Sequence, residues 1–292
     1  MVAEIFEKPK PILATVQLLP LPGAPNWNGK WERLVARAEQ EATALATGGI
    51  DALILENSED GPFSAYNQVV EPASAIAISL LVKRLSHLTG LPVGISWLGN
   101  DPATALAIAM NTDAAFMRVA VSSGARLTSD GLLSSRFQEL LQAQARLKAR
   151  LPLLLMDVTV DHIVPKTSET SVLGSGFASH LAHLLQVAHD LPPDIEKVIV
   201  LSDTDLFPEE LADLKQSLSV PVFVEVMKRF SGIDDYFAQA EGLILCGGIR
   251  KSTALEAGQK PTIDMTKVEE MVNRLRGIKS VLEMSPEEFL KR

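Results

Sequence analysis

The chain has 292 residues, of which 47% are hydrophobic and 22% are charged, an ordinary composition for a soluble globular protein. Its net charge of −9 argues against nucleic acid as a main partner, because binding to a phosphate backbone requires a basic surface. The single cysteine, Cys246, excludes an internal disulfide and is typical of a reducing compartment. The N-terminus lacks an apolar signal core, and the most apolar stretch, residues 73–82, is too short for a transmembrane segment. We therefore expect a soluble, cytoplasmic protein.

Short apolar runs alternate with longer amphipathic runs along the first half of the chain. The apolar runs predict strands at residues 12–16, 50–55, 92–98 and 114–121. Apolar residues at helical spacing predict helices at residues 31–46 and 73–88. A further helix is expected to begin at Pro102 with Asp101 as its N-cap, because aspartate caps helices and proline favours their first position.

The second half of the chain continues this alternation. Further apolar runs predict strands at residues 151–158, 196–203, 220–226 and 242–245. Helices are predicted at residues 132–150, 232–239 and 265–275, and two more are expected to begin at residues 208 and 285. The polar segment 161–176 is expected to lead into a further helix that ends near residue 189. Residues 122–131, which read SSGARLTSDG, are expected to form a loop.

Strands and helices that alternate in this way predict a parallel sheet, because each crossover between parallel strands requires a helix or a long connection. Eight such units predict a TIM (β/α)8 barrel, with a single domain over residues 1–292, a short N-terminal lead and a C-terminal helix. An open doubly wound sheet is the alternative. It should carry a glycine-rich turn after the first strand, whereas residues 19–25 read LPLPGAP, so the barrel is favoured.

Polar side chains should collect where these strands end, because barrel enzymes build their active sites at the carboxyl ends of the strands. The expected set is Gln17, Glu56, Asn57, Asp101, Arg118, Asp157, His162, Ser202, Asp203, Glu225, Gly247 and Gly248. The candidate catalytic residues are Glu56, Asn57, Arg118, Asp157 and His162. Glu56 or Asp157 could be a general acid or base, and Arg118 could clamp a carboxylate or phosphate. The alternative is that Arg118 simply neutralises Glu56 or Asp157.

The last strand is followed by CGGIRK, in which the backbone amides of Gly247 and Gly248 could bind a phosphate. Glu225 on the preceding strand argues against this site, because its charge would repel a phosphate. The acids of the mouth would also suit a hard cation such as Mg²⁺, but no metal ligands are assigned and the cofactor is undefined. Cys246 is expected to be a buried residue and not a nucleophile, and His180 and His183 to be exposed helical residues.

Four segments resemble the BtpA family: VQLLPLPGAP at residues 16–25, GGIDALILENSEDGPF at 48–63, LPVGISWLGNDPATALAIA at 91–109 and FMRVAVSSGARLTSDGLL at 116–133. The resemblance covers most of residues 12–250 and becomes weaker after Pro165. It implies a TIM barrel close to the phosphate-binding barrels. Through the cyanobacterial member of the family, it also implies a role in photosystem I biogenesis, in a protein that could lie at the cytoplasmic face of the thylakoid membrane.

The sequence departs from the family pattern where chemistry would be expected. The family's usual residues are replaced at Gln17, Ser96, Gly99, Ala120, Asp161, Ser202 and Asp203, and the usual Gly-Ser-Gly after the seventh strand is missing. The family's residues are kept at Glu56, Asn57, Asn100, Asp101, Arg118, Thr128, Asp130, Gly131, Asp157 and His162. This pattern suggests either a changed substrate or lost catalysis in a divergent member.

Two hypotheses from different classes follow. The first is a non-catalytic or weakly catalytic factor that contacts photosystem I components or the thylakoid surface. The second is an enzyme that abstracts a proton from a small phosphorylated or carboxylate, sugar-like substrate, with Glu56 or Asp157 as base and Arg118 as anion clamp. Three aromatic residues near the front loops could form an interaction surface: Trp27, Trp31 and Phe63. The sequence is also compatible with a homo-oligomer.

Overall fold

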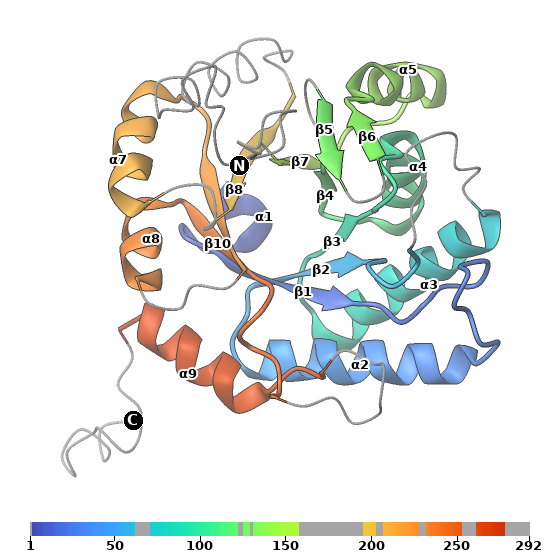
Figure 1. Cartoon of the computed structure of the whole chain (residues 1–292), viewed down its shortest axis with the longest axis horizontal. Helices are drawn as coiled ribbons and strands as arrows, with labels where there is room; N and C mark the ends of the chain where they lie inside the picture. The colour runs from blue at the N-terminus through green and yellow to red at the C-terminus, as the bar shows by residue number, and fades with distance from the viewer. Residues whose placement is uncertain are drawn as a thin grey trace, which may run out of the picture.

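A computed structural model describes residues 2–61, 71–121, 125–128, 131–157, 195–202, 207–227, 232–252 and 261–277. In this structure eight parallel strands close into a barrel, and helices surround it (Figure 1). The strands follow one another around the barrel in the order β1, β2, β3, β4, β7, β8, β9 and β10, and β10 pairs with β1. The prediction of a TIM barrel is confirmed.

The barrel strands are short, with four to six residues each. Their bounds are Ile12–Gln17 (β1), Ala52–Glu56 (β2), Val93–Ser96 (β3), Phe116–Val119 (β4), Leu153–Asp157 (β7), Lys197–Ser202 (β8), Val222–Val226 (β9) and Gly242–Leu245 (β10). Each strand overlaps one of the predicted apolar runs. Since all eight strands are parallel, their carboxyl ends meet at one end of the barrel.

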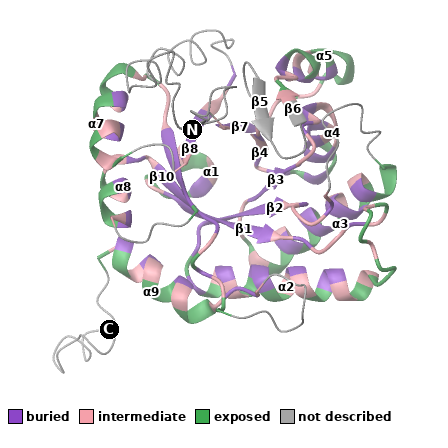
Figure 2. Ribbon diagram, in the orientation of Figure 1, coloured by how far each residue is buried: buried purple, intermediate pink, exposed green. Residues whose placement is uncertain are grey.

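The helices lie on the outside and bury one side each, except α1, which packs against the amino ends of the strands (Figure 2). Their bounds are Val2–Phe6 (α1), Trp31–Thr47 (α2), Pro72–Thr89 (α3), Pro102–Thr112 (α4), Phe137–Leu147 (α5), Pro208–Ser217 (α7), Ile233–Gln239 (α8) and Met265–Leu275 (α9). The predicted cap of α4 is confirmed, because the Asp101 Oδ1 atom accepts a hydrogen bond from the Thr104 amide at 3.1 Å. None of the helices in the described ranges combines the length and apolar composition that crossing a bilayer requires.

The segment between β4 and α5 differs from the sequence-based expectation. Residues Ala125–Thr128 (β5) pair antiparallel with Gly131–Ser134 (β6), and α5 begins only at Phe137. The predicted loop at 122–131 and the predicted helix start at 132 are therefore wrong, because a short apolar run such as that at 132–133 suits a strand as well as a helix. The helix α1 was not predicted. The predicted helices near residues 176–189 and from residue 285 lie outside the described residues.

The barrel interior is apolar toward the amino ends of the strands. Its residues alternate along each strand with residues that pack against the helices, as expected for a two-residue period. This interior cluster comprises Phe6, Leu13, Ala52, Ile54, Phe116, Leu153, Leu155, Val198, Val200, Phe223, Ile244 and Cys246. Phe6 of α1 packs at this end, with its ring centroid 5.4 Å from that of Phe116 and 6.0 Å from that of Phe223.

Two glycines, each on a strand that neighbours the strand of a phenylalanine, leave space for the rings of Phe116 and Phe223. Gly94 of β3 pairs with Phe116 of β4, and a Cβ atom added at Gly94 would lie 2.0 Å from a carbon of the Phe116 ring. A Cβ atom added at Gly242 would lie 2.8 Å from the ring of Phe223 on the neighbouring strand β9. Small residues therefore face large ones around the interior, which fills it without a pore.

We predict that Gly94→Ala lowers the free energy of unfolding by about 1–3 kcal/mol, because the added methyl group overlaps the Phe116 ring in a filled interior. Urea unfolding followed by circular dichroism measures this change. The double variant Gly94→Ala with Phe116→Leu should lose less stability than the sum of the two single variants, since leucine leaves space for the methyl group. A Gly94→Ala protein as stable as the parent would contradict this packing.

Candidate functional site

The interior becomes polar toward the carboxyl ends of the strands. Strand residues two positions apart point to the same side, so the positions that follow the apolar interior along each strand also face inward. Eight such residues, here called the polar layer, are Thr15, Glu56, Ser96, Arg118, Asp157, Ser202, Glu225 and Cys246. Active sites of barrels are built at this end. Three of the predicted residues, Glu56, Arg118 and Asp157, thus come together at one rim.

Arg118 of β4 is held by two carboxylates of the polar layer. Its Nε atom donates a hydrogen bond to Asp157 Oδ1 at 2.7 Å, and its two terminal nitrogens donate to the two oxygens of Glu225 at 2.7 Å each. All three side chains are about nine-tenths buried, with 9%, 11% and 11% of their surface exposed. Two parallel bonds to one carboxylate are the strongest geometry that a guanidinium offers. The interpretation that Arg118 neutralises Asp157 describes this arrangement, and its second partner is Glu225.

These contacts decide the charge state of Arg118. Burial alone would lower the pKa of Arg118, but Asp157 and Glu225 together raise this pKa well above that of an ordinary arginine. The guanidinium stays charged, and three of its five N–H groups already bind carboxylates of the chain. A substrate anion at Arg118 would have to compete with both of them.

Glu56 at the end of β2 adds a third carboxylate to the polar layer. Its Oε2 atom accepts a hydrogen bond from the hydroxyl of Ser96 at 3.2 Å, and Ser96 is the register partner of both Glu56 and Arg118. Three carboxylates thus face one guanidinium at this level of the barrel. The arrangement favours a cationic or hydroxyl-bearing group over an anion, because an added negative charge would be repelled at short range.

Cys246 lies beside these charges, directly after β10. Its thiol donates a hydrogen bond to Glu225 Oε1 at 3.0 Å and lies 3.2 Å from the hydroxyl oxygen of Thr15. Burial raises the pKa of Cys246 well above that of a free thiol, Glu225 and Glu56 raise it further, and Arg118 lowers it only in part. The thiol therefore stays protonated. The prediction that Cys246 is buried is confirmed, and a protonated thiol is a poor nucleophile.

Asn57 follows Glu56 but points away from the polar layer, as alternation along a strand requires. Its side-chain oxygen accepts a hydrogen bond from the Leu98 amide at 2.7 Å, and its nitrogen donates to Asp60 Oδ2 at 3.1 Å. Asp60 Oδ1 in turn accepts from the Leu21 amide at 2.8 Å. Burial raises the pKa of Asp60, although these two hydrogen bonds act in the opposite direction. The pair Asn57 and Asp60, here called the loop brace, ties together the loops that follow β1, β2 and β3.

Gly247 and Gly248 lie in a turn directly after β10. A Cβ atom at Gly247 would lie 2.2 Å from the backbone oxygen of Met227, so only glycine fits at this position. Within the part of the chain that the structure describes, no hydrogen bond is seen from the amide of either glycine. A phosphate site at this turn remains a proposal. The charge of Glu225, which was expected to repel a phosphate, is neutralised in part by Arg118.

The sequence-based interpretation missed a second buried ion cluster, which anchors this turn. Arg250 donates to both oxygens of Glu41 on α2, at 2.9 and 3.2 Å, and to the backbone oxygen of Thr15 at 3.3 Å. Arg37 donates to the same Glu41, whose side chain is fully buried. A signal was present in the sequence, because Glu41 lies on the apolar face of α2 next to Ala38 and Leu45.

Several residues of the predicted site lie outside the described residues. They are His162 and Asp203 of the predicted mouth and Phe63 of the predicted front loop, and His180 and His183 also lie outside the described ranges. Among the residues that the structure does describe, no group of three His, Cys, Asp or Glu side chains is placed to hold a metal ion.

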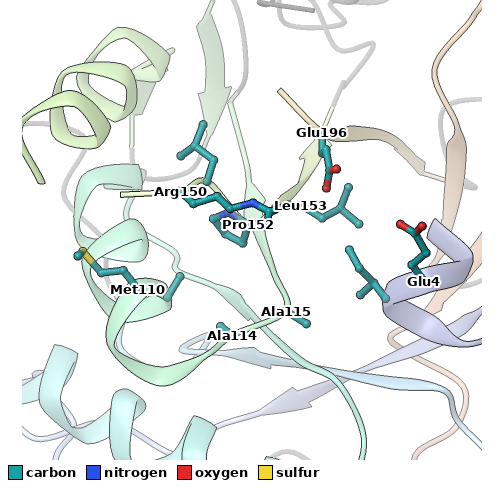
Figure 3. Close-up of a pocket in the computed structure, with 11 residues that line it drawn as sticks. Glu4, Met110, Ala114, Ala115, Arg150, Pro152, Leu153 and Glu196 are labelled. Carbon is teal, nitrogen blue, oxygen red and sulfur yellow. The ribbon is translucent and has the colours of Figure 1, made fainter. Parts of the chain in front are cut away.

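A separate cavity of about 340 Å³ lies at the opposite end of the barrel (Figure 3). Ala115 and Pro152, which line it, precede the first residues of β4 and β7, so the cavity opens at the amino ends of the strands. Glu4 of α1, Arg150 and Glu196 are its charged residues. This position is remote from the polar layer, and the cavity does not belong to the candidate site.

Comparison with known proteins places this geometry in a family. A model of the BtpA family matches residues 8–277 of the chain. The chain belongs to the BtpA family. The photosystem I biogenesis protein BtpA of Synechocystis sp. is 33% identical to it over 94% of this chain and 92% of that protein. The uncharacterised protein MJ1115 of Methanocaldococcus jannaschii is 27% identical over 93% of this chain and 97% of its own length.

Solved structures resemble this BtpA-family protein in fold alone. Dihydropteroate synthase of Xanthomonas albilineans superposes with a TM-score of 0.57 and covers 94% of both chains, at 13% sequence identity. This identity is too low to transfer an activity, since the TIM barrel hosts many unrelated functions. The similarity agrees with the closed barrel and carries no conclusion about the chemistry of the polar layer.

We predict that Arg118→Leu lowers the free energy of unfolding by about 3–5 kcal/mol, because it leaves Asp157 and Glu225 as buried carboxylates without their cation. The matched control is Arg84→Leu, which removes an ion pair to Glu39 from a side chain that is 57% exposed and should cost less than about 1 kcal/mol. Both values come from urea unfolding. If the two variants lose similar stability, the Arg118 contacts do not hold the barrel as described.

The raised pKa of Cys246 predicts how the protein behaves in alkali. Unfolding frees the thiol to ionise near its ordinary pKa of about 8.5, while the folded protein keeps it protonated. The contribution of Cys246 is thus fully present below that pH and is lost as the pH rises through the folded pKa. The native thiol should react slowly with a disulfide reagent at pH 8, and Cys246→Ala should lose less stability than the parent on going to pH 10. Rapid labelling of the folded protein would contradict this assignment.

Proposed function

We propose that this protein acts in photosystem I biogenesis, as a factor that stabilises photosystem I through protein contacts and not through chemistry in the barrel. The observation that carries the proposal is the 33% identity to the Synechocystis protein, which extends over 92% of that protein's length. Such a factor would work in the cytoplasm, at the cytoplasmic face of the thylakoid membrane, against photosystem I components or the membrane surface.

The contacts within the polar layer support a non-catalytic role. Arg118 is engaged by two carboxylates, the thiol of Cys246 is protonated and hydrogen-bonded, and Asn57 braces loops. Catalytic groups usually face a substrate, whereas these groups satisfy one another. The replaced family positions Gln17 and Ser96 point in the same direction, because they remove residue types that the family usually carries at this rim.

An enzyme is the second candidate, and a specific observation favours it. The relative MJ1115, which matches over 97% of its own length, is uncharacterised, so membership of the family does not by itself fix an assembly role. The remaining acid of the polar layer, Glu56, could abstract a proton from a small sugar-like substrate. A phosphate or carboxylate of that substrate would bind the amides of Gly247 and Gly248 more readily than the occupied Arg118. A thermal-shift screen with phosphosugars, repeated on Glu56→Ala and Arg118→Ala, tests this candidate.

The assembly role predicts that the chain replaces its relative in vivo. Expressed in a Synechocystis strain that lacks its own BtpA protein, it should raise the level of photosystem I subunits above that of an empty vector, as measured by immunoblotting and low-temperature fluorescence. The Synechocystis protein expressed in the same way is the positive control.

The variant Glu56→Gln separates the two candidates, since it removes the charge of Glu56 but keeps an acceptor for the Ser96 hydroxyl. A non-catalytic factor should tolerate this change, and photosystem I levels should match those with the parent chain. If Glu56→Gln accumulates normally but restores nothing, the enzyme is favoured. If the parent chain accumulates and restores nothing, the assembly role is rejected.

A further inference from the structure

A second cavity lies at the rim of the barrel, away from the polar layer. It measures about 340 Å³ and is lined by Leu19, Pro20, Asn26, Trp27, Asn28, Lys30, Arg33, Leu34 and Glu59. Leu19 and Pro20 follow β1, Glu59 follows β2, and Lys30 directly precedes α2 (Figure 1). The cavity, here called the rim pocket, therefore opens at the end of the barrel where ligands bind in this fold. Its volume lies within the usual range for small-molecule sites.

Hydrogen bonds hold the loop after β1, which forms one side of the rim pocket. The loop brace holds the Leu21 amide through Asp60, and the Ser74 hydroxyl donates to the backbone oxygen of Pro22 at 2.7 Å. At the other end of the loop, the Trp27 amide donates to the Ala24 oxygen at 3.0 Å. A ligand would therefore meet a loop that is already ordered, which reduces the entropy lost on binding.

The charge of the rim pocket differs from that of the chain and of the polar layer. Among the described residues that line it, Lys30 and Arg33 are basic and Glu59 is the one acid, in a protein with a net charge of −9. Both cations lie at the start of α2, where helix amides carry partial positive charge and no side chain caps the first turn. The side-chain amides of Asn26 and Asn28 add hydrogen-bonding groups. The polar part of the pocket thus suits an anionic group.

Part of the wall of the rim pocket is apolar. Trp27, which is half-buried, lines the pocket together with Leu19 and Leu34. An indole ring offers a large rigid face on which a planar group can stack. An inorganic anion would leave this wall uncovered, whereas a ring joined to the anion would cover it.

We propose that the rim pocket binds a small organic anion in which a phosphate or carboxylate is joined to a flat apolar ring. Lys30 and Arg33 hold the anionic group, and Trp27 stacks on the ring. The carboxylate-rich polar layer would repel the same ligand, so the two sites are distinct in the chemistry that they accept. This inference does not depend on a role in photosystem I biogenesis.

Isothermal titration of the full chain at low salt tests the proposal with three probes: phenyl phosphate, inorganic phosphate and benzyl alcohol. We expect phenyl phosphate to bind more tightly than inorganic phosphate, and benzyl alcohol not to bind. Lys30→Glu should weaken the affinity for phenyl phosphate by about tenfold, because it reverses a charge next to the anion. The matched control Lys83→Glu makes the same change at an exposed position of α3 and should leave binding unchanged.

Trp27→Ala distinguishes the contribution of the ring from that of the charge. It should weaken the affinity for phenyl phosphate several-fold and leave the affinity for inorganic phosphate unchanged. Trp27→Leu gives the same comparison if the alanine variant does not fold. Several results would overturn the proposal: no binding of phenyl phosphate, equal binding of inorganic phosphate, or equal losses in Lys30→Glu and Lys83→Glu. Phosphate binding that is insensitive to Lys30→Glu would assign the anion to another place, such as the Gly247 turn.

Discussion

The contacts of Arg118 with Asp157 and Glu225 hold the carboxyl ends of three barrel strands together. They join β4, which carries Arg118, to β7 and β9. Asp157 of β7 is 39 positions away from Arg118 in the sequence, and Glu225 of β9 is 107 positions away. Moving three charges out of water has a large free-energy cost, which attraction offsets only when every hydrogen bond is well formed. The geometry meets this condition, with three bonds of 2.7 Å. The same bonds occupy three of the five N–H groups of Arg118, so an anionic substrate would have to compete with Asp157 and Glu225 there.

The division of the interior into an apolar and a polar half gives the barrel a direction. Phe6 of α1 packs onto Phe116 and Phe223 at the amino ends of the strands, and Gly94 and Gly242 leave space for these rings. Among the described residues that point into the barrel, the charged ones therefore lie toward the carboxyl ends, where loops can cover them or a ligand can reach them. The protonated thiol of Cys246 marks the boundary, because its neighbours are apolar on one side and charged on the other.

Local pattern predicted the strands, and long-range pairing decided the site. Each apolar run became a strand because a strand covered on both faces excludes polar residues, and Asp101 capped α4 as its type and place indicated. Alternation alone could have separated Glu56, which faces inward, from Asn57, which faces outward. The choice of Glu225 as the partner of Arg118 depends on register and strand order around a closed barrel, which no local segment encodes. The β5–β6 hairpin was missed because its apolar run is too short to distinguish a strand from a helix.

The two sites at this end of the barrel are linked by the chain itself. Glu56 belongs to the polar layer, Asn57 follows it directly, and the loop brace reaches the Leu21 amide in the loop that forms the rim pocket. A ligand that binds only the folded rim stabilises the fold by mass action, and the brace extends this ordering to the residues next to Glu56. The polar layer is rich in carboxylates and the rim pocket carries Lys30 and Arg33, so the two places suit ligands of opposite charge.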